Sequence, residues 1–209
     1  MNKHDLVLYH SPQTRGSSVV ALLEELGVQY ELKVLDRKKG ENHSASFLAI
    51  NPLGKFPTLV HNGTVVTEQV ACYVLLADLF PEKGLAPSMD DPLRGAYLRW
   101  IAFAGSTYEP AVVDHALKRD AADPSLMPYG SYSKMLSTVY DQLEKGPFIL
   151  GDRMYAVDLL WCSCLKWCRD FGVIETNPTV DAYIERIFSR PSFEKAMELD
   201  QALLQEQAG

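Results

Sequence analysis

Residues 58–66 read TLVHNGTVV, two short β-prone runs on either side of Asn62-Gly63. An Asn-Gly pair between two such runs is the strongest short-range hairpin signal, because both residues tolerate the positive φ angles of a tight turn. Thr67 can then cap a helix that runs from about residue 68 to residue 80, where Pro81 ends it. The stretch therefore predicts an antiparallel hairpin closed by a helix.

The residues before this hairpin predict a parallel β-α-β unit. A short apolar strand over residues 6–9 runs into a turn at Ser11-Pro12. Apolar residues then recur at helical spacing over residues 19–26, and Gly27 suits the left-handed end of that helix. A second strand over residues 30–35 should pair parallel to the first. The order β-α-β followed by β-β-α is that of a thioredoxin-like domain.

The chain after about residue 91 reads as helix throughout. Residues 82–90 are rich in Pro, Gly and helix-starting residues and make a plausible linker. We therefore expect an α/β plus all-α protein, with a thioredoxin-like domain over residues 1–81, the linker at 82–90 and an all-helical bundle over 91–209. The helices of the bundle are expected near residues 92–113, 131–144, 157–171, 178–188 and 193–204.

Composition and charge exclude several partners. The 209 residues include 20 Lys and Arg against 27 Asp and Glu, a net charge of −7. This balance argues against nucleic acid, which needs a concentrated basic patch, since the longest basic cluster is residues 37–39. No apolar run approaches the about 18 residues that cross a bilayer, and the N-terminal apolar stretch is too short for a secretory signal. We expect a cytoplasmic protein with no membrane partner.

Three of the four cysteines, Cys162, Cys164 and Cys168, lie in one apolar segment. Cys164 and Cys168 can share a helix face, but Cys162 points elsewhere and no fourth ligand stands at zinc-site spacing. Free cysteines among Trp and Leu behave as small hydrophobic residues. The segment therefore predicts a buried core helix and no metal.

Four stretches carry a resemblance to a known family. They are residues 8–27, which begin LYHSP; residues 51–59, NPLGKFPTL; residues 66–69, VTEQ; and residues 151–160, GDRMYAVDLL. In this order and spacing, over nearly the whole chain, they are similar to the cytosolic glutathione transferases of bacterial type. The resemblance implies the glutathione transferase fold, glutathione as co-substrate and a homodimer.

The same resemblance implies a role for the Phe56-Pro57 peptide, which is cis in this family. The backbone N–H and C=O of Phe56 would pair with the cysteinyl unit of glutathione as an added strand does. Lys55 would meet the glycyl carboxylate. The alternative is a trans proline that only opens the following strand.

Glu68 and Gln69 stand at a helix start, where unpaired N–H groups and the helix dipole favour an anion. The resemblance makes that anion the γ-glutamyl carboxylate of glutathione. Many family members have Ser where Gln69 stands, so the longer side chain is a departure from the family pattern. The alternative for Glu68 is a first-turn acid that only complements the helix dipole.

Enzymes of this family activate the glutathione thiol by a hydrogen bond that lowers its pKa below the about 8.5 of a free thiol. The turn after the first strand, SPQTRGSS, offers hydroxyls but no cysteine, which argues against the subgroup that forms mixed disulfides. We expect Thr14 to supply the bond, with Ser11 as the second candidate. Ser17 and Tyr9 lie nearby, and Arg15 would add positive potential beside the sulfur. The alternative for Thr14 and Ser17 is plain helix capping.

The electrophile is expected between the domains, against the first helix of the bundle. Apolar and aromatic residues recur there at helical spacing from Tyr97 to Tyr108. Tyr108, close to the break at Pro110, is the candidate pocket residue. The alternative is that this stripe is core packing.

These observations predict a glutathione transferase that joins the glutathione thiolate to a small apolar electrophile. The protein would act by proximity and by hydrogen bonding to sulfur, without forming a covalent bond itself. Two alternatives stay open on the same fold: a glutathione-dependent disulfide or peroxide reductase, and a non-catalytic interaction module.

Overall fold

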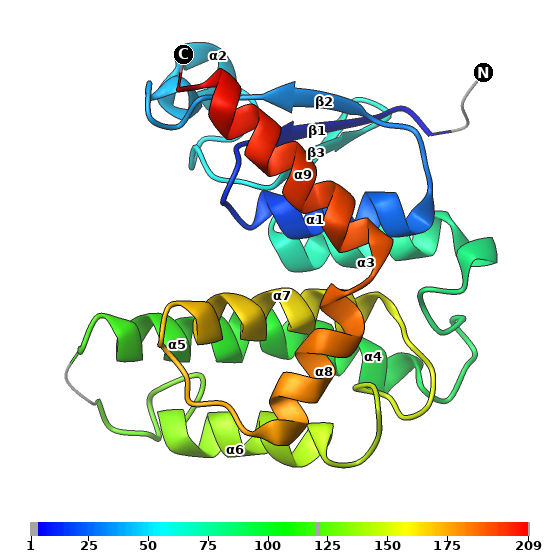
Figure 1. Ribbon diagram of the computed structural model, residues 1–209, viewed down its shortest axis with the longest axis vertical. Coiled ribbons are helices and arrows are strands. Elements are labelled where there is room, and N and C mark those ends of the chain that lie inside the picture. The colour runs from blue at the N-terminus through cyan, green and yellow to red at the C-terminus, as the bar shows by residue number, and fades with distance from the viewer. Residues whose placement is uncertain (1–3, 120–121, 209) are drawn as a thin grey trace. The chain divides into compact units, whose positions relative to one another are not determined.

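The computed structural model describes residues 4–119 and 122–208 (Figure 1). The chain forms two compact units. One contains the residues up to Leu79 together with those from Pro191 onward, and the other is Phe80–Arg190.

A four-stranded sheet forms the centre of the first unit. Its strands are β1 (Leu6–His10), β2 (Glu31–Val34), β3 (Thr58–His61) and β4 (Thr64–Thr67), in the order β2-β1-β3-β4. β1 is parallel to β2 and antiparallel to β3, and β3 is antiparallel to β4. This is the predicted thioredoxin-like arrangement. The hairpin turns at Asn62 and Gly63, whose φ angles of 49° and 80° are the positive values that the Asn-Gly pair predicts.

Helices cover this sheet. α1 (Gly16–Leu26) buries most of its residues and ends at Gly27, whose φ of 62° lets its N–H donate to the carbonyls of Leu23 and Glu24. α3 (Gln69–Leu79) follows β4 in the chain. The short η1 (Glu41–His43) and α2 (Ala45–Leu48) belong to the connection from β2 to β3.

The last helix of the chain, α9 (Pro191–Glu206), packs on α1 in the first unit (Figure 1). Ser192 Oγ donates to Glu25 Oε2 at 2.7 Å, and Lys195 Nζ lies 3.3 Å from Glu24 Oε2. The sequence placed this helix among those of residues 91–209. The predicted domain limits stay a prediction. They assign α9 to the second domain, whereas in the structure α9 packs in the first unit.

The second unit is all-helical, as predicted. Its elements are η2 (Pro81–Lys83), α4 (Arg94–Phe103), the π-helical turn η3 (Ala104–Tyr108), α5 (Glu109–Ala116), α6 (Tyr132–Leu143), α7 (Ala156–Asp170) and α8 (Pro178–Phe188). Trp161 is buried in the core of this unit. The ring centroids of Trp161 and Trp100 are 5.7 Å apart, and the Nε1–H of Trp161 donates to the Trp100 carbonyl. Over the described ranges, no helix is long and apolar enough to cross a bilayer.

Asp158, in the first turn of α7, is fully buried. It accepts hydrogen bonds from the N–H of Ile149 at 2.8 Å, the N–H of Tyr155 at 2.8 Å and the hydroxyl of Tyr183 at 3.0 Å. Burial raises the pKa of this carboxyl to about 6, against the opposing effect of the three hydrogen bonds. The carboxyl group therefore joins α7, α8 and the preceding loop.

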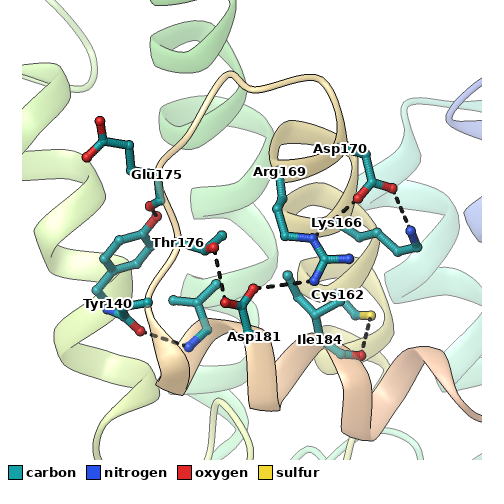
Figure 2. Close-up of polar contacts among 11 residues, drawn as sticks. Tyr140, Cys162, Lys166, Arg169, Asp170, Glu175, Thr176, Asp181 and Ile184 are labelled. Carbon is teal, nitrogen blue, oxygen red and sulfur yellow. Dashed lines mark hydrogen bonds and ion pairs between the residues drawn. The ribbon is translucent and has the colours of Figure 1, made fainter.

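Polar contacts also join the far end of α7 to α8, as Figure 2 shows. Arg169 Nη1 lies 3.4 Å from Asp181 Oδ1, and Thr176 Oγ1 donates to the other oxygen of that carboxylate. Cys162 Sγ donates to the Ile184 carbonyl at 3.6 Å. Burial raises the pKa of the Cys162 thiol far above its ordinary value, so this cysteine stays protonated and packs as a core residue.

Candidate active site

Three of the predicted site segments meet at one edge of the sheet. Tyr9 pairs with Thr58, and Thr58 pairs with Thr67. The end of β1, the start of β3 and the end of β4 therefore stand side by side, within about 10 Å of one another at the usual strand spacing. The turn that begins at Ser11 follows β1 directly. The Phe56-Pro57 peptide directly precedes β3, and Glu68 directly follows β4. The topology thus gathers segments far apart in sequence.

The Phe56-Pro57 peptide is cis, as the resemblance implies. Neither the backbone N–H nor the C=O of Phe56 is hydrogen-bonded to another residue in the described part of the chain. Its ring stacks on Phe47, with centroids 5.4 Å apart. A half-buried segment with an unpaired donor and acceptor is suited to pairing with an extended peptide.

The start of α3 offers a place for an anion. Glu68 has a φ of 65°, and its carbonyl accepts the N–H of Cys72 at 3.0 Å, so it occupies the N-cap position directly before α3. The N–H groups of the first turn have no acceptor within an α-helix, and the helix dipole adds partial positive charge there. The Glu68 side chain is exposed beside them.

Gln69 is buried and its side chain is directed at α1. Its Nε2 donates to Ser18 Oγ at 2.5 Å, and Ser18 Oγ in turn donates to the carbonyl of Arg15 at 3.0 Å. Tyr73 OH donates to the Ser18 carbonyl at 2.9 Å. The amide of Gln69 therefore connects the starts of α3 and α1. Its backbone N–H, in the first turn of the helix, is the group left to face a ligand.

The predicted activating hydroxyls differ in what they contact. Thr14 Oγ1 donates to the Ser11 carbonyl at 2.7 Å and accepts the N–H of Gly16 at 3.1 Å, which is the local capping that the sequence left open as an alternative. Ser17 Oγ donates to Asp200 at 2.6 Å. The Ser11 side chain is buried, with 2% of its surface exposed. A thiolate would thus compete with the Ser11 carbonyl for the proton of Thr14.

Sequence reasoning missed two residues that contact this turn, His10 at the end of β1 and Asp200 on α9. His10 Nε2 lies 2.8 Å from Asp200 Oδ1, and the N–H of Gln13 donates to Asp200 Oδ2 at 2.9 Å. Burial would raise the pKa of Asp200, but hydrogen bonds from His10, Ser17 and Gln13 hold it below its ordinary value. No local signal relates the end of a strand to a helix 190 positions later.

The remaining predicted site residues differ in how exposed they are. Lys55 and Arg15 are exposed, and the Lys55 carbonyl is held by Asn51 and Thr58. Tyr108 is 1% exposed in the second unit, where its ring packs edge-on against Trp161 at 5.0 Å. This burial is what core packing requires, so the pocket role of Tyr108 stays a prediction.

Known proteins share these features. Residues 4–72 match the N-terminal domain family of glutathione S-transferases. A glutathione transferase structure from Methylococcus capsulatus is 31% identical, with a TM-score of 0.78 over 94% of this chain and 99% of that one. A sphingomonad glutathione S-transferase complexed with glutathione is 25% identical, with a TM-score of 0.78 over 93% of this chain and 98% of that one.

A further relative differs in its name. The disulfide-bond oxidoreductase YfcG of Escherichia coli is 27% identical over 97% of this chain and 96% of its own length. The thioredoxin-like sheet, the helical second unit and these similarities along nearly the whole chain define one class. The chain belongs to the glutathione S-transferase family.

Proposed function

We propose that this protein is a glutathione transferase, which joins the thiolate of glutathione to a small apolar electrophile. One observation carries the proposal. The unpaired backbone N–H and C=O of Phe56 stand at the same sheet edge as the start of α3 and the hydroxyl-rich turn after β1. Peptide pairing, anion binding and thiol activation are thereby available within the length of one tripeptide.

Glutathione would lie along this edge. Its cysteinyl unit would pair with the backbone of Phe56, and its γ-glutamyl carboxylate would accept the N–H groups at Glu68 and Gln69. The exposed Lys55 would meet the glycyl carboxylate. Both carboxylates would then face positive potential, and the sulfur would point toward the turn after β1.

The turn after β1 would activate the sulfur. A hydroxyl proton of Thr14 or Ser11 would be donated to the thiolate, and the charge of Arg15 would add to the stabilisation, so the thiol pKa would fall below the about 8.5 of free glutathione. The thiolate then attacks the electrophilic carbon, a sulfur–carbon bond forms, and the leaving group departs with its electron pair or the electrons move onto the electrophile. Tyr108 is the proposed residue of the electrophile pocket.

A second candidate is glutathione-dependent disulfide reduction. The name of the Escherichia coli relative favours it. Because residues 11–18 contain no cysteine, the reacting thiol would have to be that of glutathione. In that reaction a glutathione thiolate attacks a disulfide sulfur and releases the other sulfur as a thiolate. The homodimer, which the family resemblance implies, and the cytoplasmic location, which the composition indicates, are further proposals.

Two measurements test these proposals. Titration calorimetry with glutathione at up to millimolar concentration should give a heat of binding, and its absence would remove both enzymatic proposals and leave the interaction module. Initial rates with chlorodinitrobenzene and with a glutathione mixed disulfide then separate the two reactions. A transferase turns over the first substrate faster, whereas a reductase prefers the second.

A further inference from the structure

The carboxylate of Asp200 receives three hydrogen bonds from residues on both sides of Thr14. His10 Nε2 lies 2.8 Å from Oδ1, while the N–H of Gln13 and the hydroxyl of Ser17 reach Oδ2 at 2.9 Å and 2.6 Å. Asp200 belongs to α9, the last helix of the chain, and the three donors belong to β1, the following turn and α1. One side chain therefore fixes the beginning, middle and end of the turn.

The turn needs such a contact. Gln13 has a φ of 57°, a left-handed conformation that is unfavourable for a residue with a side chain. Its N–H donates to the carboxylate of Asp200, which compensates for this conformation. The hydrogen bonds hold the pKa of Asp200 below its ordinary value, so the carboxylate is charged at neutral pH and accepts all three bonds in their stronger, charge-assisted form.

The contact also fixes the ring of His10. An ionised carboxylate only accepts hydrogen bonds, so Nε2 carries the proton that it donates to Asp200. Nδ1 is buried and has no hydrogen-bond partner in the described residues. A Cβ placed on Gly16 would lie 2.6 Å from this Nδ1 and 3.1 Å from Thr14 Oγ1. The ring of His10 and the hydroxyl of Thr14 therefore both lie in the space that a side chain at position 16 would occupy, and the Thr14 hydroxyl also accepts the N–H of Gly16.

We propose that Asp200 is a positioning residue for thiol activation. It holds the turn of residues 11–17 in the geometry from which the hydroxyl of Thr14 or Ser11 reaches the sulfur of glutathione. The inference rests on the proposed function. Misplacing a reacting group by about 1 Å costs about 100-fold in rate, so a contact outside the reaction centre can control the chemical step.

The competing explanation is that Asp200 only attaches α9 to α1. The chain offers a matched control for it, because Ser192 makes a hydrogen bond between the same two helices, to Glu25 at 2.7 Å. Glu25 lies near the end of α1, away from the turn at its start. A Ser192→Ala variant loses attachment of α9 without losing a contact of residues 10–17.

The experiment compares the full-length wild type with Asp200→Ala, Asp200→Asn and Ser192→Ala. For each variant, kcat and the KM for glutathione are measured with chlorodinitrobenzene across pH, and the ultraviolet absorbance of the bound thiolate gives its pKa. In Asp200→Ala we expect kcat to fall about 10- to 100-fold, the KM for glutathione to change less than about 3-fold, and the thiol pKa to rise toward its free value. Ser192→Ala should keep the wild-type kcat and thiol pKa.

Each outcome of this experiment either supports or overturns the positioning role of Asp200. If Asp200→Ala does not fold, Asp200→Asn, which keeps one accepting oxygen, must show the same change of kcat and thiol pKa to a smaller extent. If the wild type is active but the thiol pKa is unchanged in the Asp200 variants, only the positioning role is overturned. The same follows if Ser192→Ala loses as much kcat as Asp200→Ala. A wild type that neither binds glutathione nor turns over either substrate overturns the proposed function, and this inference with it.

Discussion

Asn51 and Thr58 are hydrogen-bonded to each other, with Asn51 Nδ2 2.8 Å from Thr58 Oγ1, and both are buried. Each also donates to the carbonyl of Lys55, Asn51 at 2.9 Å and Thr58 at 3.0 Å. The two side chains thereby close the loop that presents Lys55 and Phe56 to the sheet edge. The position of the proposed peptide-binding backbone is thus set by one amide and one hydroxyl.

An Asn51→Ala substitution should loosen this loop. It removes a buried donor from two acceptors, so we expect the free energy of unfolding to fall by about 1–3 kcal/mol and the dissociation constant of glutathione to rise. Urea unfolding and titration calorimetry measure the two effects. Asn177→Ala is the control, because it removes the N-cap of α8 in the second unit at a cost of about 1 kcal/mol. Equal weakening of glutathione binding in both variants would contradict the role of the loop.

Asp158 should make the stability of the protein depend on pH. Its pKa in the folded state is raised from 3.8 to about 6. Between these values the folded protein holds a proton that the unfolded chain releases, so the favourable contribution is complete below about pH 4 and is lost as the pH rises through 6. Relative to Asp158→Asn, which does not titrate, the wild type should lose on the order of 2–3 kcal/mol of unfolding free energy between pH 4 and pH 7.

Urea unfolding of the two proteins at several pH values between 4 and 7.5 checks this prediction. The quantity of interest is the difference between wild type and variant at each pH, because other groups titrate equally in both. A difference that is independent of pH would show that the three hydrogen bonds to Asp158 balance its burial, and one that grows in favour of the wild type as the pH rises would show that they outweigh it.

Local sequence signals predict much of the fold. Asn62-Gly63 specifies a turn because the φ angles it needs are those that these two residues tolerate, and Gly27 ends α1 for the same reason. Helical periodicity likewise located the elements of the second unit. It did not reveal the π-turn at Ala104–Tyr108, which interrupts the single helix predicted over residues 92–113, because the apolar spacing continues through the turn.

The candidate site was predictable only where its chemistry is local. The helix start at Glu68 and the proline at position 57 have signatures in adjacent residues, so the sequence located them. The contact between His10 and Asp200 has none, because it depends on α9 returning to pack on α1. For Gln69, the sequence showed a longer side chain but not its direction, which is decided by Ser18 on another helix.

Thr14 and Ser11 can be separated by substitution. If Thr14 activates the thiol, Thr14→Ala should lower kcat by about 10- to 100-fold with little change in the affinity for glutathione, since the hydroxyl would act mainly on the charged sulfur. Thr14→Ser keeps the hydroxyl and should restore most of the rate, which distinguishes activation from loss of packing. Steady-state kinetics with chlorodinitrobenzene measure both. A loss of rate in Ser11→Ala, with Thr14→Ala near wild type, would move the assignment to Ser11.

Gly16 and Gly95 should respond in opposite ways to alanine, although both lie in the first turns of helices. At Gly16 the new methyl group would stand 2.6 Å from His10 Nδ1, so the ring would have to move, and we expect a loss of about 1–3 kcal/mol in unfolding free energy. At Gly95 a Cβ meets no atom within 4 Å, so alanine should raise stability by up to about 1 kcal/mol through its higher helix propensity. Denaturant unfolding of the two variants measures the contrast. If Gly16→Ala is as stable as Gly95→Ala, His10 can leave the contact with Asp200 at little cost, and the turn that carries Thr14 is not held by it.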